Sequence, residues 1–452
     1  MTSRRELLTD AAARAAQYLD SLEERSVFPA REAIEALQIL MQEPLPEGPS
    51  EANEILAQLD KVAGPATVAS AGGRYFGFAT GAAMPATVAA NWLATAWDQN
   101  SFNSVSSPAI ALIEETALRW IKQALDLPAT AEGTLVTGAT MANFTCLAAA
   151  RQRVLADAGW NADEKGLFGA PEIDVIVGEE VHATIFKVLS LLGLGRDRVI
   201  RVPVDDQGRM RTDALPTIDK PSILCIQAGN VNSGAFDPAT EVIEHAHEAG
   251  AWVHVDGAFG LWARASEALA PQTAGLDAAD SWATDAHKWL NVPYDCGLAL
   301  VREPDDLRRA MSISGAYLLS SAQRDQIDYS PDSSRRARAV DIWAALKSLG
   351  RSGLTKMIDR NCRQAVRLAD GLRRNNIEIL NDVVLNQVVV AFGDANRTNR
   401  IIDAVQADGT CWAGATVWRN RAAMRISVSA WATTNADIEK SLNAILKAHR
   451  QA

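Results

Sequence analysis

Between about residue 110 and residue 302, short apolar runs alternate with longer helical patterns, and this alternation constrains the fold more than any other feature of the sequence. Helical spacing separates several of the runs, for example over 184–192 and 238–249. Strands that alternate with helices in this way form a mostly parallel sheet with helices on both faces. The expected strands are 134–136, 174–177, 198–202, 222–227, 252–256, 281–284 and 297–302. The sequence therefore predicts an α/β fold.

The regions on either side of the alternation have a different character. The first 40 or so residues and the stretch 51–62 repeat Leu and Ala at helical spacing. After about residue 345, a helical pattern over 353–374 precedes strand-like runs at 383–392 and 424–428. We therefore expect an N-terminal helical segment that packs on a partner subunit (1–82), a large α/β domain (83–345) and a small C-terminal α+β domain (346–452).

Composition excludes several classes of protein. The chain has 452 residues, 48% of them hydrophobic, so it can bury a large core and is not intrinsically disordered. Its formal net charge of −11 argues against a nucleic-acid-binding protein. The uncharged stretches 75–97 and 133–150 are rich in Gly, Ala, Thr and Asn, which gain little from lipid. We expect them inside the protein or between subunits, with no membrane partner.

The cysteines and the N-terminus indicate the compartment. Five cysteines lie far apart and form no CxxC pair, so neither a disulfide framework nor a cysteine metal site is predicted. The first residues carry charges and no apolar signal-peptide core. No HExxH, Walker A or GxSxG pattern is present. We therefore expect a cytoplasmic protein with reduced thiols and without a metal site.

An acid and an amine follow two of the expected strands. Asp256 ends the run 252–256, and Lys288 comes shortly after the run 281–284. Ligands of a parallel sheet bind outside the carboxyl ends of its strands, so both groups are expected to converge on one crevice. Gly257 and Ala258 are small enough for a flat ring to approach the sheet there.

This pair suits one cofactor chemistry. A lysine amine forms an imine with a carbonyl, and an aldehyde cofactor with a pyridine ring needs an anion beside its ring nitrogen. A carboxylate about 4 Å from a pyridinium attracts it by roughly 4 kcal/mol at an effective dielectric near 20, which keeps the ring protonated and electron-withdrawing. These are the requirements of pyridoxal 5′-phosphate. Gly138, Ala139 and Thr140 would offer donors for its phosphate at a helix N-terminus, although such a turn also fits a plain strand-to-helix connection.

Several further segments resemble one family. The group II pyridoxal-phosphate-dependent decarboxylases, which include aromatic amino acid, glutamate and diaminobutyrate decarboxylases, carry similar motifs in the same order. The matching segments are GATMAN (138–143), EVH (180–182), AGNVNSGAFD (228–237), HVDGA (254–258) and DAHKW (285–289). The resemblance covers roughly residues 74–431. It implies a fold-type I pyridoxal-phosphate-dependent transferase fold, in which the large domain binds the cofactor.

The resemblance also assigns roles to individual residues. It implies that Lys288 forms the imine, that Asp256 pairs with the pyridine nitrogen, and that His182 stacks on the ring face opposite Ala258. His287 would contact the phosphate or position the substrate carboxylate. Cofactor contacts are further implied for Gly138, Ala139, Thr140 and Asn230. Without the family, His182 would be interpreted as an ordinary, partly buried histidine.

The same family suggests the reaction. Loss of the α-carboxylate as CO2 leaves a carbanion that an acid must reprotonate. In these decarboxylases a loop tyrosine supplies the proton, and AYLLS (316–320) resembles that segment, so Tyr317 is the predicted acid and Tyr329 the second candidate. A tyrosine that only packs at a subunit boundary is the alternative. Arg425 matches the family's arginine for the substrate carboxylate, and its planar fork suits that group.

The substrate is less constrained by the sequence. Phe78, Asn100 and Phe102 resemble residues that line the side-chain pocket, with contributions from the neighbouring subunit. We expect decarboxylation of an L-amino acid to its amine, with aromatic or apolar side chains slightly favoured. An acidic or diamino acid such as glutamate, aspartate or diaminobutyrate is the second option. Departures from the family pattern, at Ala139, Met141 and Asn230–Val231, leave the amine product open.

Other interpretations keep the cofactor but change the reaction. A carbon–carbon lyase or an oxygen-consuming aldehyde synthase is possible. In plant relatives, however, replacement of the loop tyrosine diverts the carbanion to aldehyde, so retention of Tyr317 favours the amine. An aminotransferase would leave Tyr317 without a function, and a non-catalytic protein would not need Lys288 and Asp256. Because the stretch 75–97 must be buried and the family builds its sites across a two-fold interface, we also predict a homodimer.

Overall fold

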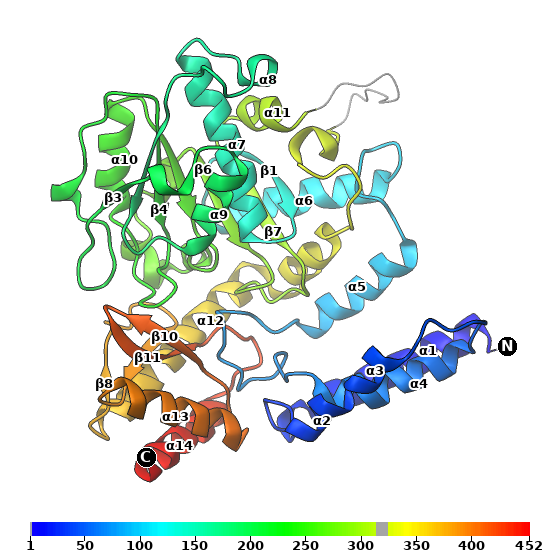
Figure 1. Ribbon diagram of the computed structural model, residues 1–452. Helices are drawn as coiled ribbons and strands as arrows, with labels where there is room; N and C mark the ends of the chain where they lie inside the picture. The colour runs from blue at the N-terminus through cyan, green and yellow to red at the C-terminus, as the bar shows by residue number, and fades with distance from the viewer. Residues whose placement is uncertain (1, 313–323) are drawn as a thin grey trace.

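The computed structural model describes residues 2–312 and 324–452, and a seven-stranded sheet forms its centre (Figure 1). Strand β7 is antiparallel to both of its neighbours, whereas the remaining pairs are parallel. In order across the sheet, the strands are β1 (Glu132–Val136), β7 (Gly297–Val301), β6 (Ser281–Asp285), β5 (Trp252–Asp256), β4 (Ser222–Gln227), β2 (Asp174–Gly178) and β3 (Ile200–Val202). The mostly parallel sheet confirms the predicted α/β class.

Helices cover both faces of this sheet, which explains why its strands are nearly continuous apolar runs. One face packs against α7 (Ala139–Asp157), α9 (Ala183–Leu191) and α11 (Pro304–Met311). The other face packs against α6 (Pro108–Ala124), α10 (Ala239–Glu248) and the first part of α12 (Ala339–Arg373). Residues of β4, β5 and β6 are buried along their whole length.

A second, antiparallel sheet of four strands lies near the C-terminus. Its order is β10 (Gly414–Trp418), β11 (Arg421–Ser427), β9 (Gln387–Ala391) and β8 (Glu378–Ile379). Helices α13 (Ala395–Asp408) and α14 (Asn435–Gln451), together with the last part of α12, form a separate core with it. Helix α12 therefore supplies side chains to both cores: Ala345 belongs to the first and Leu368 to the second.

The N-terminal part is a helical arm, which Figure 1 shows projecting from the rest of the chain. It contains α1 (Arg4–Asp20), α2 (Arg31–Ala36), α3 (Gln38–Gln42) and α4 (Ala52–Ala63). Of the described side chains in these four helices, none is buried. Helix α5 (Pro85–Trp97) then leads to the large sheet, and α8 (Ala162–Lys165) follows α7.

Short 3-10 helices fill several connections. They lie at Ser21–Glu23, Gly64–Ala66, Arg196–Arg198, Thr212–Ala214, Gly260–Ala265, Glu267–Gln272, Leu276–Ala278 and Gln326–Tyr329. Within the described parts of the chain, no helix combines the length and the apolar character needed to cross a membrane.

Candidate functional site

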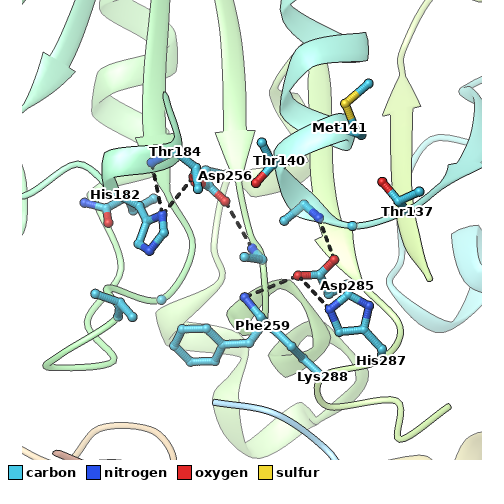
Figure 2. A pocket seen from close by; sticks show the side chains of 16 residues that line it. Thr137, Thr140, Met141, His182, Thr184, Asp256, Phe259, Asp285, His287 and Lys288 are labelled. Atoms are coloured by element: carbon cyan, nitrogen blue, oxygen red, sulfur yellow. Dashed lines mark hydrogen bonds and ion pairs between the residues drawn. The ribbon is translucent and has the colours of Figure 1, made fainter. Parts of the chain in front are cut away.

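A cavity of about 330 Å³ opens at the carboxyl ends of β4, β5 and β6 (Figure 2). This is the edge of the sheet at which ligands of parallel α/β proteins bind. The cavity is lined by Thr137, Gly138, Ala139, Thr140, Met141, His182, Thr184, Gln227, Gly229, Val231, Asp256, Ala258, Phe259, Asp285, His287 and Lys288. The residues expected from the sequence to hold a cofactor therefore lie together, except for Asn230.

Asp256 forms the floor of the cavity. It is the last residue of β5, is 6% exposed, and accepts a hydrogen bond from the Ala258 amide (3.3 Å). Among the described residues, no Arg, Lys or His nitrogen forms an ion pair with its carboxylate. A buried carboxylate without a cation is costly, so the cavity is suited to a ligand that brings a positive charge to Asp256.

Lys288 lies across the cavity from this floor and pairs with a different acid. Its Nζ is 3.2 Å from Asp285 Oδ2, and the Nε2 atom of His287 is 3.5 Å from the same oxygen (Figure 2). The Cys296 amide donates to His287 Nδ1 (3.1 Å), so the neutral ring carries its proton on Nε2, facing Asp285. Burial lowers the pKa of His287, and nearby Lys288 lowers it further, while Asp285 raises it.

His182 borders the cavity from the opposite wall. It precedes α9, and its Nδ1 lies 2.8 Å from Thr184 Oγ1. His182 is exposed at the edge of the cavity, yet partial desolvation lowers its pKa, Asp256 raises it, and the positive charges of Lys288 and Arg425 lower it further. The net decrease favours a neutral, flat ring at neutral pH.

The turn between β1 and α7 supplies donors for an anion. Gly138 precedes the helix, and no side chain of this turn caps its first amides. A Cβ atom at Gly138 would lie 3.3 Å from His287 Cε1, so glycine allows the turn to approach the lysine segment closely. The amides of α7 and the Thr140 hydroxyl face the cavity, where the helix dipole favours negative charge.

Asn230 lies beside the cavity, but its side chain is used elsewhere. Its Oδ1 accepts hydrogen bonds from the amides of Asn232 (2.9 Å) and Ser233 (3.2 Å). The adjacent residues Gly229 and Val231 line the cavity instead. Asn230 therefore shapes the turn that carries them.

Arg425 lies on β11, opposite Gly414 and Val389 in the small sheet. Its positive charge lowers the pKa of His182, which lines the cavity. Burial lowers the pKa of Arg425, and it forms no ion pair with a carboxylate in residues 2–312 and 324–452. Such a half-buried, unpaired guanidinium is suited to a carboxylate ligand.

Phe78 belongs to an aromatic cluster near the lysine segment. Its ring stacks on Trp412 with 5.5 Å between centroids, and Tyr75 stacks on the same tryptophan at 5.2 Å. Phe78 adopts a positive φ of 53°, which is unusual for a residue with a bulky side chain. Its side chain is 61% exposed. The following Gly81 donates its amide hydrogen to the His287 carbonyl (3.3 Å), so this cluster and the lysine segment are joined through the backbone.

Asn100 and Phe102 contact a different part of the chain. Asn100 Oδ1 accepts from the Arg335 amide (3.0 Å), and the Phe102 carbonyl accepts from the Ile327 amide (3.1 Å). Neither side chain lines the cavity within one chain. Tyr329, the second candidate for the acid, also lies away from it: Arg324 is 4.3 Å above its ring, and burial raises its pKa. Tyr317, the first candidate, is outside the described residues.

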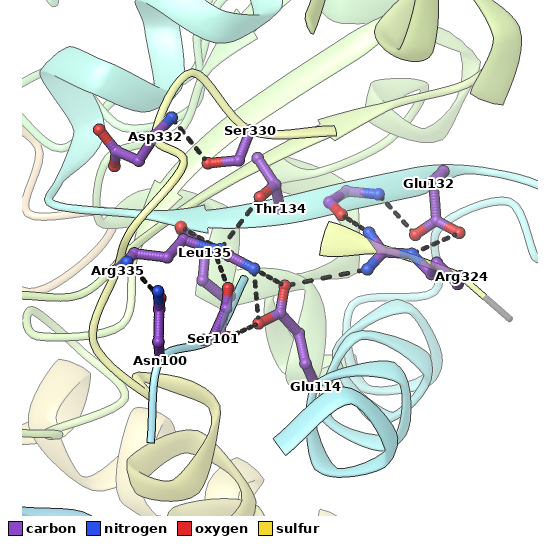
Figure 3. Close-up of polar contacts among 11 residues, drawn as sticks. Asn100, Ser101, Glu114, Glu132, Thr134, Leu135, Arg324, Ser330, Asp332 and Arg335 are labelled. Atoms are coloured by element: carbon purple, nitrogen blue, oxygen red, sulfur yellow. Dashed lines mark hydrogen bonds and ion pairs between the residues drawn. The ribbon is translucent and has the colours of Figure 1, made fainter. Parts of the chain in front are cut away.

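A buried ion-pair network ties these segments to the sheet (Figure 3). The Arg335 guanidinium binds Glu114 at 2.7 Å, and the two side chains are 2% and 1% exposed. Arg335 also donates to the carbonyls of Leu135 (2.8 Å) on β1 and Ser101 (2.9 Å). The network thus connects α6, β1 and the segment that precedes α12.

The sequence reasoning missed several residues of the cavity, above all Asp285. Asp285 ends β6 as Asp256 ends β5, and Gln227 ends β4 in the same way. The rule that identified Asp256, a polar residue at the carboxyl end of a buried strand, would also have identified both of these. Thr137 and Phe259 had no comparable signal.

Known proteins are similar to this chain over most of its length. Residues 35–392 match the family described as "Pyridoxal-dependent decarboxylase conserved domain". An aromatic-L-amino-acid decarboxylase of Bacillus atrophaeus is 27% identical over 356 residues, which cover 75% of this chain and 72% of that protein. An L-2,4-diaminobutyrate decarboxylase of Rhizobium meliloti (strain 1021) is 28% identical over 372 residues, covering 78% and 70%. A structure of Oryza sativa TDC with PLP and tryptamine has a TM-score of 0.89 at 22% identity, covering 99% of this chain and 97% of that one.

Proposed function

The chain belongs to the pyridoxal-dependent decarboxylase family, and on this premise we propose that it converts an L-amino acid with an aromatic or apolar side chain into the amine and CO2. The family establishes a carboxy-lyase that depends on pyridoxal phosphate. The observation that carries the proposal for this chain is the convergence of Asp256, Lys288 and the start of α7 on one cavity.

The donors of the cavity fit the cofactor. Buried Asp256, which has no cationic partner among the described residues, would hold a protonated pyridine nitrogen. The amides at the start of α7 and the Thr140 hydroxyl would hold the phosphate, and Lys288 would hold the aldehyde carbon. His182 and Ala258 would contact the two faces of the ring. When bound, pyridoxal phosphate supplies an electron sink for the electron pair that remains after CO2 leaves.

Three further side chains would act on the substrate. Arg425 would bind the carboxylate, since a planar guanidinium forms paired hydrogen bonds with it. Neutral His287 carries its proton on Nε2 and would orient groups at the phosphate end of the cavity. Tyr317, which lies outside the described residues, would donate a proton to the α-carbon, as its resemblance to the family's loop tyrosine implies.

The aromatic or apolar substrate class is supported by the side chains near the lysine. Phe259, Met141 and Val231 give the cavity wall apolar surface. The stack of Phe78, Trp412 and Tyr75 adds aromatic surface beside the lysine segment. Apart from Lys288 and the two histidines, no basic side chain lines the cavity within the described residues, which disfavours an acidic substrate side chain.

A substrate panel tests the proposal. Purified protein reconstituted with pyridoxal phosphate is incubated with aromatic, apolar, acidic and diamino L-amino acids, and CO2, amine, aldehyde and ammonia are measured. We expect amine and CO2 in equal amounts from an aromatic or apolar substrate. Amine formed only from glutamate, aspartate or diaminobutyrate would overturn the substrate class. Aldehyde with ammonia in place of amine would favour an aldehyde synthase, and amino-group exchange with a 2-oxo acid an aminotransferase.

We further propose that the protein is a homodimer. The helical arm exposes a series of large apolar side chains, and α5 exposes three more. The exposed side chains are Leu8, Leu19, Ile34, Ile39, Leu40, Met41, Ile55 and Leu59 on the arm, and Trp92, Leu93 and Trp97 on α5. Many large apolar side chains exposed on one part of a chain are typical of an interface between subunits. A second copy of the chain would cover these side chains, and the resemblance to the family implies that Asn100 and Phe102 would then contribute to the partner's cavity.

A reducing compartment agrees with the state of the thiols. All five cysteines are free, and burial raises the pKa of Cys146 and Cys411 to about 12. Thiols with such a pKa are unreactive and do not form disulfides readily. This supports the proposal that the protein works in the cytoplasm.

A further inference from the structure

Asp285 is the only carboxylate among the described residues that contacts both the lysine and the anion-binding turn of the cavity. Its Oδ1 accepts a hydrogen bond from the Ala139 amide at 2.6 Å. Its Oδ2 lies 3.2 Å from Lys288 Nζ and 3.5 Å from His287 Nε2 (Figure 2). The side chain is 2% exposed and lines the cavity. One acid therefore links the amine and the turn.

The contact with Ala139 places a negative charge at the start of α7. Ala139 is the first residue of that helix, and Gly138 before it has no side chain with which to cap it. The amides of a helix N-terminus attract anions, and here a carboxylate from the end of β6 occupies the first of them. This amide belongs to the group of donors that a phosphate would use.

Because Asp285 is buried, its charge affects both the stability of the cofactor-free site and the binding of a phosphate. Positive groups stabilise a buried carboxylate, and for Asp285 these groups are Lys288 and the helix N-terminus. The reverse also holds, because Lys288 would lack a counter-charge in the cofactor-free protein without Asp285. When a phosphate binds beside the same amides, however, the fixed negative charge of Asp285 repels it.

We propose that Asp285 is an internal counter-anion of the phosphate site: it neutralises Lys288 and the start of α7 when no cofactor is bound, and it weakens the hold on the cofactor phosphate. Asp285 is thus a positioning residue that keeps the site folded between loading events and keeps the cofactor exchangeable. This inference rests on pyridoxal phosphate as the cofactor and not on the identity of the amino acid substrate.

The variant Asp285→Asn separates this role from a merely structural one. An asparagine keeps the shape of the side chain and an oxygen that can accept from Ala139, but it removes the negative charge. We expect two effects of opposite sign. The cofactor-free protein loses thermal stability, because Lys288 and the helix start lose their counter-charge. The same variant binds phosphate-bearing ligands more tightly, because the repulsion is gone.

The experiment uses the full chain freed of cofactor. Dissociation constants for pyridoxal phosphate, for pyridoxal without a phosphate, and for inorganic phosphate are measured by absorbance or by thermal shift. In Asp285→Asn we expect the ratio of pyridoxal phosphate affinity to pyridoxal affinity to rise by about tenfold, and inorganic phosphate to bind several-fold more tightly. The melting temperature without ligand falls by a few degrees.

Asp280→Asn is the matched control. Asp280 precedes β6, pairs with His247 at 2.9 Å and lies at the opposite end of the strand that Asp285 ends. The Asp280→Asn variant changes the net charge by the same amount as Asp285→Asn. Its ratio of pyridoxal phosphate affinity to pyridoxal affinity should therefore stay at the wild-type value. An unchanged or lower ratio in Asp285→Asn would overturn the inference, as would a melting temperature equal to that of the wild type. Failure of the wild-type chain to bind pyridoxal phosphate would instead contradict the proposed function.

Discussion

At the scale of single residues, the cavity contains two buried acids, Asp256 and Asp285, which have different partners. Asp256 has no cationic partner among the described residues, whereas Asp285 is engaged by Lys288 and by the Ala139 amide. An unpaired buried acid is free to bind a cationic ring, and a paired acid is not. Their positions at the ends of β5 and β6 account for the difference, because only Asp285 faces the start of α7.

The variant Asp256→Asn tests the first of these tasks. We expect the decarboxylation rate to fall by at least about a hundredfold, because the lost attraction to a ring cation is worth roughly 4 kcal/mol at an effective dielectric near 20. The phosphate donors remain, so pyridoxal phosphate should still bind. Steady-state rates together with a cofactor titration check both statements. A variant with full activity would remove Asp256 from the site.

The variant Tyr317→Phe tests the proposed proton donor. Without the hydroxyl, we expect amine production to fall by about 10²–10⁴, the usual contribution of a positioned acid. With dissolved O2 present, aldehyde and ammonia should rise, because O2 oxidises the fraction of decarboxylated substrate that escapes reprotonation. Product analysis by mass spectrometry distinguishes the two, and Tyr329→Phe serves as the comparison. If Tyr329→Phe alone abolished the amine, the assignment would pass to Tyr329.

His247 gives a prediction on pH and stability. Its Nε2 lies 2.9 Å from Asp280 Oδ2, and this hydrogen bond raises the pKa of His247 above its usual value. A raised pKa in the folded state means that the stabilisation is complete below the unfolded pKa of about 6.5 and is lost as pH rises through the folded one. We expect His247→Gln to destabilise the protein by a few tenths of a kcal/mol at pH 6 and by less at pH 9. Urea unfolding at both values measures this, and an equal loss at both would contradict it.

At the scale of elements, much of the large sheet follows from its apolar runs. Strands buried on both faces need continuous apolar sequence, so the runs at 222–227 and 252–256 predicted β4 and β5 with their observed bounds. The rule for carboxyl ends then placed Asp256 and Lys288 at one edge, and the cavity lies there. Apolar runs and the rule for carboxyl ends therefore predicted the α/β class and the edge of the sheet at which the cavity lies.

Other features depend on contacts that no local pattern encodes. Strand β7 runs antiparallel to its neighbours β1 and β6 in a sheet whose other pairs are parallel. Asn230 was predicted to contact the cofactor, yet its side-chain oxygen accepts a hydrogen bond from the Asn232 amide in the following turn. Arg335 and Glu114 are separated by 221 residues, and ordinary charged residues carry no signal of such a pairing. These features come from tertiary packing, which periodicity does not describe.

The network around Glu114 gives a prediction at this scale. Arg335→Met removes the hydrogen-bonded cation of the buried Glu114 carboxylate and leaves, among the described residues, only Arg324 at 3.9 Å. We therefore expect the free energy of unfolding to fall by about 3 kcal/mol, the lower end for a broken buried pair. Adding Glu114→Gln to this variant removes the uncompensated charge and should restore part of the loss. Urea unfolding of the single and double variants measures the coupling. Equal stability of wild type and Arg335→Met would show that the pair contributes nothing.

At the scale of the whole molecule, the exposed apolar arm determines the predicted assembly. Of the described side chains in α1 to α4, none is buried within one chain, so the arm needs a partner to cover it. Leu93 on α5 is also exposed, at 54%. The predicted division at 1–82, 83–345 and 346–452 remains a proposal, since α12 continues through residue 345.

The variant Leu93→Glu tests the dimer. A charge in an apolar interface is costly to desolvate, so we expect the variant to sediment as a monomer at concentrations at which the wild type is a dimer. Phe168→Glu is the control, because Phe168 is 98% exposed and lies outside the arm and α5. Its sedimentation should equal that of the wild type. A monomeric wild type would contradict the prediction.

Helix α12 has a consequence for how the molecule loses its structure. Its helical geometry is interrupted at Gly350, and the helical part after this residue contacts both cores: Ile358 packs with the large sheet and Leu368 packs with the small one. If either core melted, one half of the helical part after Gly350 would lose its packing neighbours, and the other half would be weakened. The core of the large sheet and the core of the small sheet are therefore coupled into a single cooperative unit. We expect both cores to unfold together on heating, in a single calorimetric transition and not in two successive ones.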